Sequence, residues 1–127
     1  MPKIPTNKTR PDYWPDEQRA LCALDALPED TARGFTLIGN APDARLDVIV
    51  WRAGDRLSGF VNKCPHMGLP LETFPDRFLT ATGDALICSA HGAQFDAAGK
   101  CFAGPCKGQN LKPVTLKLVD GMITLCP

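Results

Sequence analysis

Two short boxes decide how this chain folds and what it holds, and they read Cys64-Pro65-His66-Met67-Gly68 and Cys88-Ser89-Ala90-His91-Gly92-Ala93-Gln94-Phe95. Each box brings one cysteine and one histidine close together. Two such loops can present two thiolates and two imidazoles to one inorganic centre. The chain has only two histidines, and both fall inside these boxes. Random placement would seldom produce this spacing, so the boxes predict a metal-binding site.

The composition is that of a globular domain of ordinary size. Across 127 residues, 44% are apolar and 22% are charged, and 14 basic residues balance 14 acidic ones. This profile argues against a disordered chain, and the charge balance gives no sign of binding to nucleic acid or an anionic membrane. No apolar run approaches the roughly 18 residues that span a bilayer, and the N-terminal segment lacks the apolar centre of a secretory signal. We therefore expect a cytoplasmic protein.

The residues around the boxes show short β-strands separated by turns. Apolar and β-branched segments lie at residues 19–24, 35–38, 46–51, 57–61, 84–88, 94–96, 114–118 and 122–125. Turn signals separate them, among them Gly54 and the hairpin pair Asp120-Gly121. No helical periodicity of any length competes with this pattern. The sequence therefore predicts an all-β, antiparallel fold with Trp51 and Phe60 in its core.

Residues 1–18 are expected to form an N-terminal arm outside this domain. The segment is rich in proline, with prolines at positions 2, 5, 11 and 15. Proline at this density cannot hold a helix and seldom joins a central strand. The remaining residues, 19–127, are expected to form a single domain.

In its two boxes the chain resembles the Rieske [2Fe–2S] family, in which two histidines replace two cysteines on one of the two irons. The resemblance implies one cluster per chain, with Cys64 and Cys88 on one iron and His66 and His91 on the other. It also implies the fold of the family, an antiparallel β sandwich or barrel base. A small cluster-binding subdomain, at about residues 62–108, is inserted into that base.

Four positions indicate which subfamily the chain resembles. Respiratory-type Rieske proteins have disulfide cysteines where this chain has Leu69 and Ala90, and hydroxyl donors to sulfur where it has Ala93 and Phe95. Hydrogen bonds to sulfur stabilise the reduced cluster, so their loss predicts a reduction potential toward the lower end of the Rieske range of roughly −150 to +300 mV. In these respects the chain resembles the ferredoxins and ferredoxin-like domains that feed oxygenases.

Six cysteines in a cytoplasmic chain favour metal or redox chemistry over a disulfide scaffold. Cys101 and Cys106 flank Gly104-Pro105, which the resemblance makes the turn of a third loop over the cluster. These two cysteines could form a disulfide, act as a redox switch beside the cluster or remain two thiols, and a cytosolic setting favours free thiols. Cys22 and Cys126 are expected to be buried, inert thiols in the first and last strands.

The resemblance implies a one-electron carrier, a ferredoxin-like component of an oxidoreductase or oxygenase system with a reductase as donor and an oxygenase as acceptor. Rieske oxygenases hold a second, mononuclear iron on two histidines and a carboxylate. His66 and His91 are already assigned to the cluster, so the chain is not expected to be an enzyme on its own. Met67 and Leu69 are expected to form an exposed apolar rim where a redox partner docks.

Three other interpretations stay open on the sequence alone. The chain could be a regulatory or assembly subunit whose cluster senses redox state or supports the fold. It could be a zinc-stabilised interaction module, because zinc accepts two cysteines and two histidines, although a Cys-x-His pair is unusually tight for structural zinc. Finally, both histidines could be ordinary structural residues.

Overall fold

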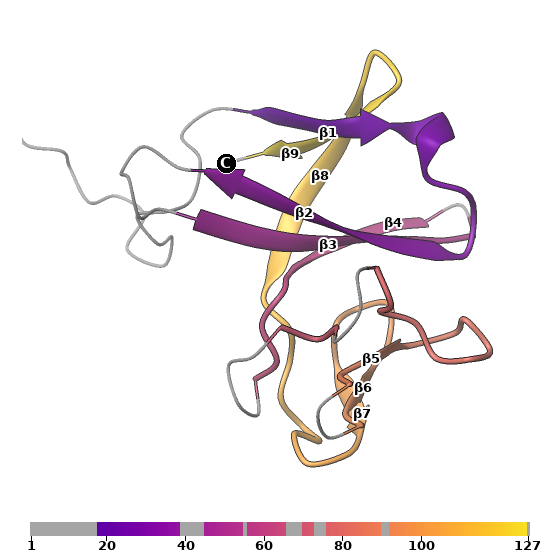
Figure 1. Cartoon of the computed structure of the whole chain (residues 1–127), viewed down its shortest axis with the longest axis vertical. Coiled ribbons are helices and arrows are strands. Elements are labelled where there is room, and N and C mark those ends of the chain that lie inside the picture. Colours follow the sequence, from indigo (N-terminus) through magenta and orange to yellow (C-terminus); the bar gives the residue numbers. More distant parts are fainter. Residues whose placement is uncertain are drawn as a thin grey trace, which may run out of the picture.

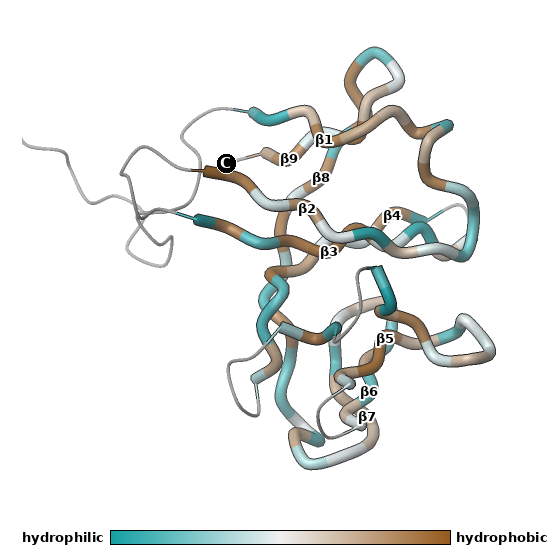
Figure 2. Tube along the Cα trace, in the orientation of Figure 1, coloured by the Kyte–Doolittle hydropathy of each residue, from teal (hydrophilic) through white to brown (hydrophobic). Residues whose placement is uncertain are grey.

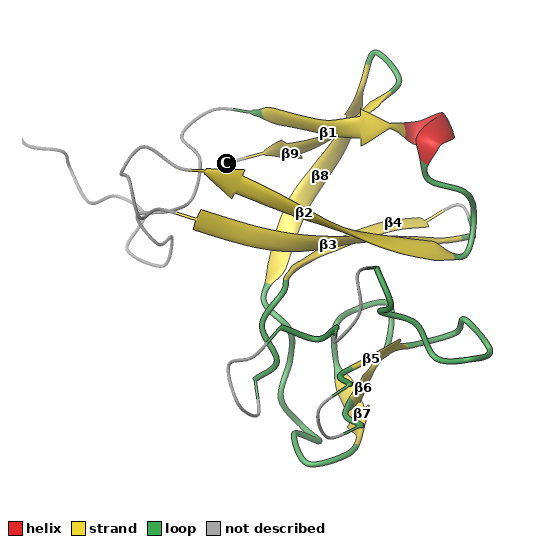
Figure 3. Ribbon diagram, viewed as in Figure 1, coloured by secondary structure: helices red, strands yellow, loops and turns green. Residues whose placement is uncertain are grey.

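The computed structural model describes residues 18–38, 45–54, 56–65, 70–72, 76–89 and 92–126. Within these ranges the chain consists almost entirely of strands and loops, arranged as a larger and a smaller sheet (Figure 1; Figure 3). Every strand pair is antiparallel. The predicted fold class, an antiparallel β base with a small inserted subdomain, is confirmed.

The larger sheet has six strands in the order β1-β9-β8-β4-β3-β2. The strands are β1 (Arg19–Ala23), β2 (Thr31–Ile38), β3 (Arg45–Ala53), β4 (Arg56–Val61), β8 (Pro113–Val119) and β9 (Met122–Cys126). A single 3-10 turn, η1 (Leu24–Ala26), follows β1. Strand β2 begins at Thr31 rather than at the predicted residue 35, because it stays paired with β3 as far as Arg52.

Strand β3 is buried on both faces and separates two cores. Ile49 and Trp51 belong to a core shared with the smaller sheet, whereas Val48 and Val50 pack in the base with residues of β9. Side chains alternate across a strand, so consecutive residues of β3 serve different cores. This arrangement explains the uninterrupted apolar run of the predicted strand. It also confirms that Trp51 and Phe60 are core residues, since each is nearly fully buried.

The smaller sheet is inserted between β4 and β8 and has the order β5-β6-β7. Its strands are β5 (Leu86–Ile87), β6 (Gln94–Phe95) and β7 (Cys101–Ala103). Figure 2 shows hydrophobic residues on β3 and at β5, the two elements whose side chains share a core. Strand β5 is shorter than the predicted segment 84–88, because Asp84 accepts hydrogen bonds from the preceding turn and Cys88 already belongs to the next loop.

The insertion is fastened to the base at two places. At Gly34 of β2, an added Cβ would lie 3.1 Å from the ring of Phe78, so the two parts approach closely here. The Gly34 N–H also donates a hydrogen bond of 2.9 Å to the carboxylate of Asp76. On β4, the Ser58 hydroxyl donates to the carbonyl of Ala97 over 3.0 Å. These contacts fix the smaller sheet against the base.

Two predicted turns are present in the structure. Gly54, with a φ of 62°, directly follows the last residue of β3. Asp120 and Gly121, with φ values of 51° and 79°, lie between β8 and β9. Two successive left-handed residues are typical of a two-residue hairpin turn. The predicted arm over residues 1–18 lies outside the described residues, apart from Gln18.

Candidate metal centre

Two of the four predicted ligands, Cys64 and Cys88, lie in the described part of the chain, and the structure buries both. Each is 1% exposed, and both belong to the core that contains Trp51. Cys64 follows β4 of the larger sheet, and Cys88 follows β5 of the smaller one. The structure thus brings the two predicted thiolate ligands into one buried cluster. The other two, His66 and His91, lie outside the described residues.

The segment that carries Cys64 is fixed by Asn62, two residues before it. The Asn62 backbone N–H donates to the carbonyl of Asp47 in β3 over 2.8 Å. Its side chain reaches the other way: the amide nitrogen donates to Glu72 over 2.8 Å, and the amide oxygen accepts the backbone N–H of Leu71 over 2.8 Å. Asn62 therefore ties the segments before and after the first box to the base sheet.

The second box forms a closed loop between β5 and β6. The Cys88 N–H donates to the carbonyl of Ala93 over 2.8 Å, and the Gly92 N–H donates back to the carbonyl of Cys88 over 2.9 Å. Gly92 has a φ of 76°, a left-handed conformation that glycine adopts without strain. Ser89 donates its N–H to the carbonyl of Leu71 over 2.7 Å. Leu71 thus links the segment that leads into the first box with the second box, because its N–H donates to Asn62 and its carbonyl accepts from Ser89.

The predicted turn at Gly104-Pro105 is present and packs on the second box. Gly104 has a φ of 94°, and an added Cβ would lie 2.6 Å from the Cα of Ala93. No real side chain tolerates that distance, so the loop can approach only through glycine. The third loop therefore rests on the backbone of the second. Its predicted role over a cluster stays a prediction.

The structure places the free thiols of Cys101 and Cys106 side by side, and the expectation that a cytosolic setting keeps them reduced stays a prediction. Both are buried, and their sulfurs are 3.3 Å apart. The pKa of Cys106 is raised to about 12, mainly by burial and in addition by the neighbouring thiols of Cys101 and Cys64, since thiolates at close range repel. Three of the six cysteines therefore meet in one place.

Of the two remaining cysteines, Cys126 in β9 is buried as predicted. Cys22 is only half-buried, which corrects the prediction that it is a core thiol. The reason is its strand: β1 lies at an edge of the larger sheet. Partial burial still raises the pKa of the Cys22 thiol.

The described donor set suits a metal that binds sulfur. Cysteine ligates as the thiolate, and a thiolate in an apolar core needs a compensating positive charge. Iron–sulfur clusters and zinc both supply that charge and prefer soft sulfur ligands. Ala93 and Phe95 are fully buried and bring no hydroxyl to this core. Cys64 and Cys88 therefore fit the predicted cluster.

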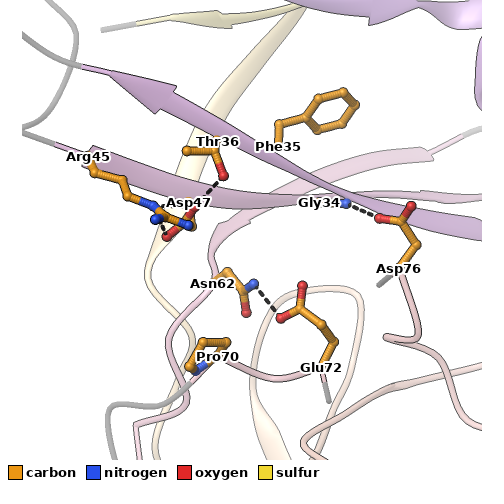
Figure 4. A pocket seen from close by; sticks show the side chains of 9 residues that line it. All are labelled: Gly34, Phe35, Thr36, Arg45, Asp47, Asn62, Pro70, Glu72 and Asp76. Atoms are coloured by element: carbon orange, nitrogen blue, oxygen red, sulfur yellow. Dashed lines mark hydrogen bonds and ion pairs between the residues drawn. The ribbon is translucent and has the colours of Figure 1, made fainter. Parts of the chain in front are cut away.

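An open pocket of about 530 Å³ lies where β2 and β3 meet the segment after the first box (Figure 4). It is lined by Gly34, Phe35, Thr36, Arg45, Asp47, Asn62, Pro70, Glu72 and Asp76. Its polar groups largely bond to one another: Thr36 and Arg45 donate to Asp47, and the Asn62 amide donates to Glu72, as the dashed lines of Figure 4 show. The pocket is thus a junction between the base and the cluster-binding region.

Sequence analysis missed Asn62 and the pocket. The pocket is drawn from separate segments of the chain, and no local pattern predicts that they meet. Asn62 did leave a signal, because it is a polar residue that directly follows the apolar strand 57–61 and precedes Cys64 by two positions. Asparagine at a strand end commonly bonds nearby backbone groups.

Within the described ranges, no group of three or more histidine, cysteine, aspartate or glutamate residues is arranged to hold a metal ion. Two of the four predicted ligands lie outside those ranges, so this finding does not bear on the full set of four. Among the same described residues, the structure contains no helix with the length and apolar character needed to cross a membrane.

Comparison with known proteins identifies one family. Residues 17–120 match the family model of the Rieske [2Fe-2S] domain. No curated protein matches the chain. The matched span begins just before β1 and ends at the β8–β9 turn, so it includes both boxes and nearly all of the described structure.

Several solved structures share the fold. The ferredoxin of carbazole 1,9a-dioxygenase from Nocardioides aromaticivorans IC177 is 22% identical with a TM-score of 0.67, and the match covers 88% of this chain and 99% of that one. A chain from the complex of reduced oxygenase and oxidized ferredoxin in carbazole 1,9a-dioxygenase is 22% identical with a TM-score of 0.66. That match covers 86% of this chain and 92% of the other chain. A component of 2-oxoquinoline 8-monooxygenase is 21% identical with a TM-score of 0.68. That match covers 88% of this chain and 26% of the other chain.

Proposed function

This chain belongs to the Rieske [2Fe–2S] family, and on that basis we propose that it is a ferredoxin-like carrier that passes one electron at a time from a reductase to an oxygenase. One observation carries the proposal: the fold matches a ferredoxin over 99% of that ferredoxin's length, with two candidate thiolate ligands buried in one core. The match to an oxygenase component instead covers about a quarter of that longer chain, 26%.

In this proposal Cys64 and Cys88 hold one iron through thiolates, and His66 and His91 hold the other through imidazoles. The cluster, when bound, supplies a reversible one-electron redox step. The burial of both cysteines supports this assignment, because a buried sulfur site excludes water from the metal. The two imidazoles would then form the route by which the electron leaves, as they do in folds where histidines lie nearer the surface than the thiolates.

The chain contributes a rigid frame for the two ligand loops. Leu71 bonds to Asn62 on one side and to Ser89 on the other, and Ser89 is the neighbour of Cys88. Gly104 places the third loop directly on Ala93. A site held in this way by its own loops needs little rearrangement when it binds its metal or changes its charge.

The reduction potential is proposed to lie toward the low end of the Rieske range. Hydrogen bonds to cluster sulfur stabilise the reduced, more negative state. Ala93 and Phe95 stand at the positions where respiratory-type proteins place hydroxyl donors, and both are fully buried without such a group. A lower potential suits a protein that delivers electrons to an oxygenase.

An oxygenase as acceptor is supported by the similarity to a chain from a complex of oxygenase and ferredoxin. The reductase as donor and a cytoplasmic location belong to the same proposal. The docking rim at Met67 and Leu69 lies outside the described residues, so it remains a prediction. Replacing both residues with alanine should slow electron delivery without bleaching the cluster.

Visible and electron-spin-resonance spectra of anaerobically purified protein, before and after dithionite, test the cluster. We expect a brown oxidised form and, on reduction, the low-average-g signal of a mixed histidine and cysteine cluster. His66→Ala and His91→Ala should each abolish that signal. A colourless protein that contains zinc would instead identify a structural module.

Stopped-flow mixing tests the carrier role. A flavin-dependent reductase should reduce the cluster, and an oxidised Rieske oxygenase should reoxidise it. If dithionite reduces the cluster reversibly but the cluster exchanges electrons with neither protein, a regulatory or assembly role replaces the proposed one.

A further inference from the structure

Two cysteines that flank the turn of the third loop have no ligand role in the proposed function. Cys101 and Cys106 are 1% and 0% exposed, and the thiol of Cys106 points to that of Cys101 with 3.3 Å between the sulfurs. Cys106 and Cys64 belong to the same buried core. From this geometry we propose that Cys101 and Cys106 are a dithiol site that closes reversibly to a disulfide within the third loop.

The backbone holds the two cysteines in place for this reaction. The Cys101 N–H donates to the carbonyl of Gln109 over 2.9 Å, and the Cys101 carbonyl accepts the N–H of Gly108 over 3.2 Å. The Gln109 N–H donates to the carbonyl of Cys106 over 2.9 Å. The loop is therefore closed on itself whether or not its sulfurs are bonded. A disulfide needs a sulfur–sulfur distance of about 2.05 Å, so the two sulfurs have to approach by little more than about 1 Å.

The reaction requires a two-electron oxidant, and a small disulfide of the glutathione class supplies one. One cysteine thiolate attacks the glutathione disulfide and releases one glutathione thiol, which leaves a mixed disulfide. The second cysteine then attacks the protein sulfur of the mixed disulfide and releases the second glutathione thiol. Both cysteines are oxidised, one glutathione disulfide is reduced to two thiols, and the two protons pass to those thiols.

Burial makes this exchange slow rather than impossible. The sulfurs are covered, but residues 107–110 of the same loop are exposed and Gly104 and Pro105 form its exposed turn. Opening of this turn gives a small oxidant access to the thiols. Once formed, the disulfide is covered again, in a loop whose backbone hydrogen bonds already close it on itself. Such a bond resists reduction, because the two thiols stay at high effective concentration.

The sequence allows a direct test by mass spectrometry. Trypsin cuts after Lys100 and Lys107, so Cys101 and Cys106 fall together in one heptapeptide, residues 101–107. Cluster-loaded protein is equilibrated anaerobically in buffers of reduced and oxidised glutathione, quenched in acid, alkylated and digested. Equilibrium is approached from both directions, from fully reduced protein and from protein first oxidised with diamide. Cluster loading is followed by visible absorption.

We expect a heptapeptide about 2 Da lighter than the dithiol and without alkyl groups, its fraction rising with the glutathione ratio as a two-electron couple. Cys101→Ser and Cys106→Ser should each leave one alkylated cysteine and no cross-link. Cys22→Ser, a cysteine variant in another strand, should leave the cross-link unchanged. The proposal is overturned if protein from both starting points yields a doubly alkylated heptapeptide at the most oxidising ratio.

Discussion

Asn62 holds Leu71 through a hydrogen bond in which the backbone N–H of Leu71 donates to the side-chain oxygen of Asn62 over 2.8 Å. Leu71 is fully buried, and its carbonyl accepts the N–H of Ser89 from the second box. One asparagine two residues before Cys64 is therefore connected through Leu71 to the residue that follows Cys88. Asn62 also lines the pocket where β2 and β3 meet the segment after the first box.

Asn62→Ala should destabilise the protein and loosen the metal site. It leaves the buried N–H of Leu71 without its partner, which costs about 1–3 kcal/mol of the free energy of unfolding. Urea denaturation measures this loss, and the rate of bleaching in a chelator measures cluster retention. Arg45→Ala is the matched control, because Arg45 lines the same pocket but forms an exposed ion pair with Asp47 that contributes little. Equal losses in the two variants would contradict the role given to Asn62.

Gly104→Ala should be far more damaging than Gly108→Ala. Both glycines have left-handed φ values, 94° and 92°, so alanine costs about 1–3 kcal/mol of backbone strain at either position. Only at Gly104 does the new Cβ collide with the Cα of Ala93, at 2.6 Å, whereas nothing lies within 4 Å at Gly108. We expect Gly104→Ala to lower the free energy of unfolding by a further ~1–3 kcal/mol because of this collision. Urea denaturation of both variants measures the difference, and identical midpoints would show that the third loop can move off the second box.

Phe95→Tyr should raise the reduction potential of the cluster. The variant adds a hydroxyl in the fully buried core that contains both cysteines, where it can donate to sulfur. A preference of about 1 kcal/mol for the reduced state corresponds to an increase of roughly 40 mV for a one-electron couple. A redox titration followed by electron-spin resonance measures the potential. Phe102→Tyr, at an exposed position of the same small sheet, is the control and should leave it unchanged. If the Phe95→Tyr protein contains a full complement of cluster and still has the parental reduction potential, the missing hydroxyl does not explain a low potential.

Asp84 should titrate at a lower pH than an ordinary aspartate. Hydrogen bonds from the hydroxyls of Thr82, over 2.7 Å, and of Thr80, over 3.0 Å, favour the carboxylate and lower its pKa. The stabilisation of the turn is therefore complete above the unfolded-state pKa of about 3.9 and is lost as the pH falls through the lower folded-state value. Carbon NMR titration of the Asp84 carboxyl measures it. Thr82→Ala should move the pKa upward, and Thr36→Ala, which removes a hydroxyl elsewhere, should not.

Local patterns in the sequence predicted the features that depend on neighbouring residues. The hairpin at Asp120-Gly121 follows from the left-handed preference of those two residues, and strand β3 follows from the apolar run at 46–51. The sequence did not predict that this run faces two separate cores. A continuous apolar run indicates burial but does not say which side chain faces which partner.

The sequence predicted the part of the site that depends on the local spacing of residues within the two boxes. Cys64 and Cys88 stood out by their spacing to histidine, and the fold brings them into one core. The bonds of Asn62 to Leu71 and the meeting of Cys106 with Cys64 depend on how loops close in three dimensions. No repeating pattern in the sequence predicts such contacts, because each involves single residues in irregular segments.

The alternation of β3 between two cores has a consequence for how the protein comes apart. Val48 and Ile49 are neighbours in the chain, yet one supports the base and the other supports the region of the ligand loops. Loosening either core removes the support from one face of the same strand, so neither half can melt while the other stays intact. Heat or denaturant should therefore release the metal and unfold the base in a single transition, and the amide hydrogens of residues 48–51 should be among the last to exchange with solvent.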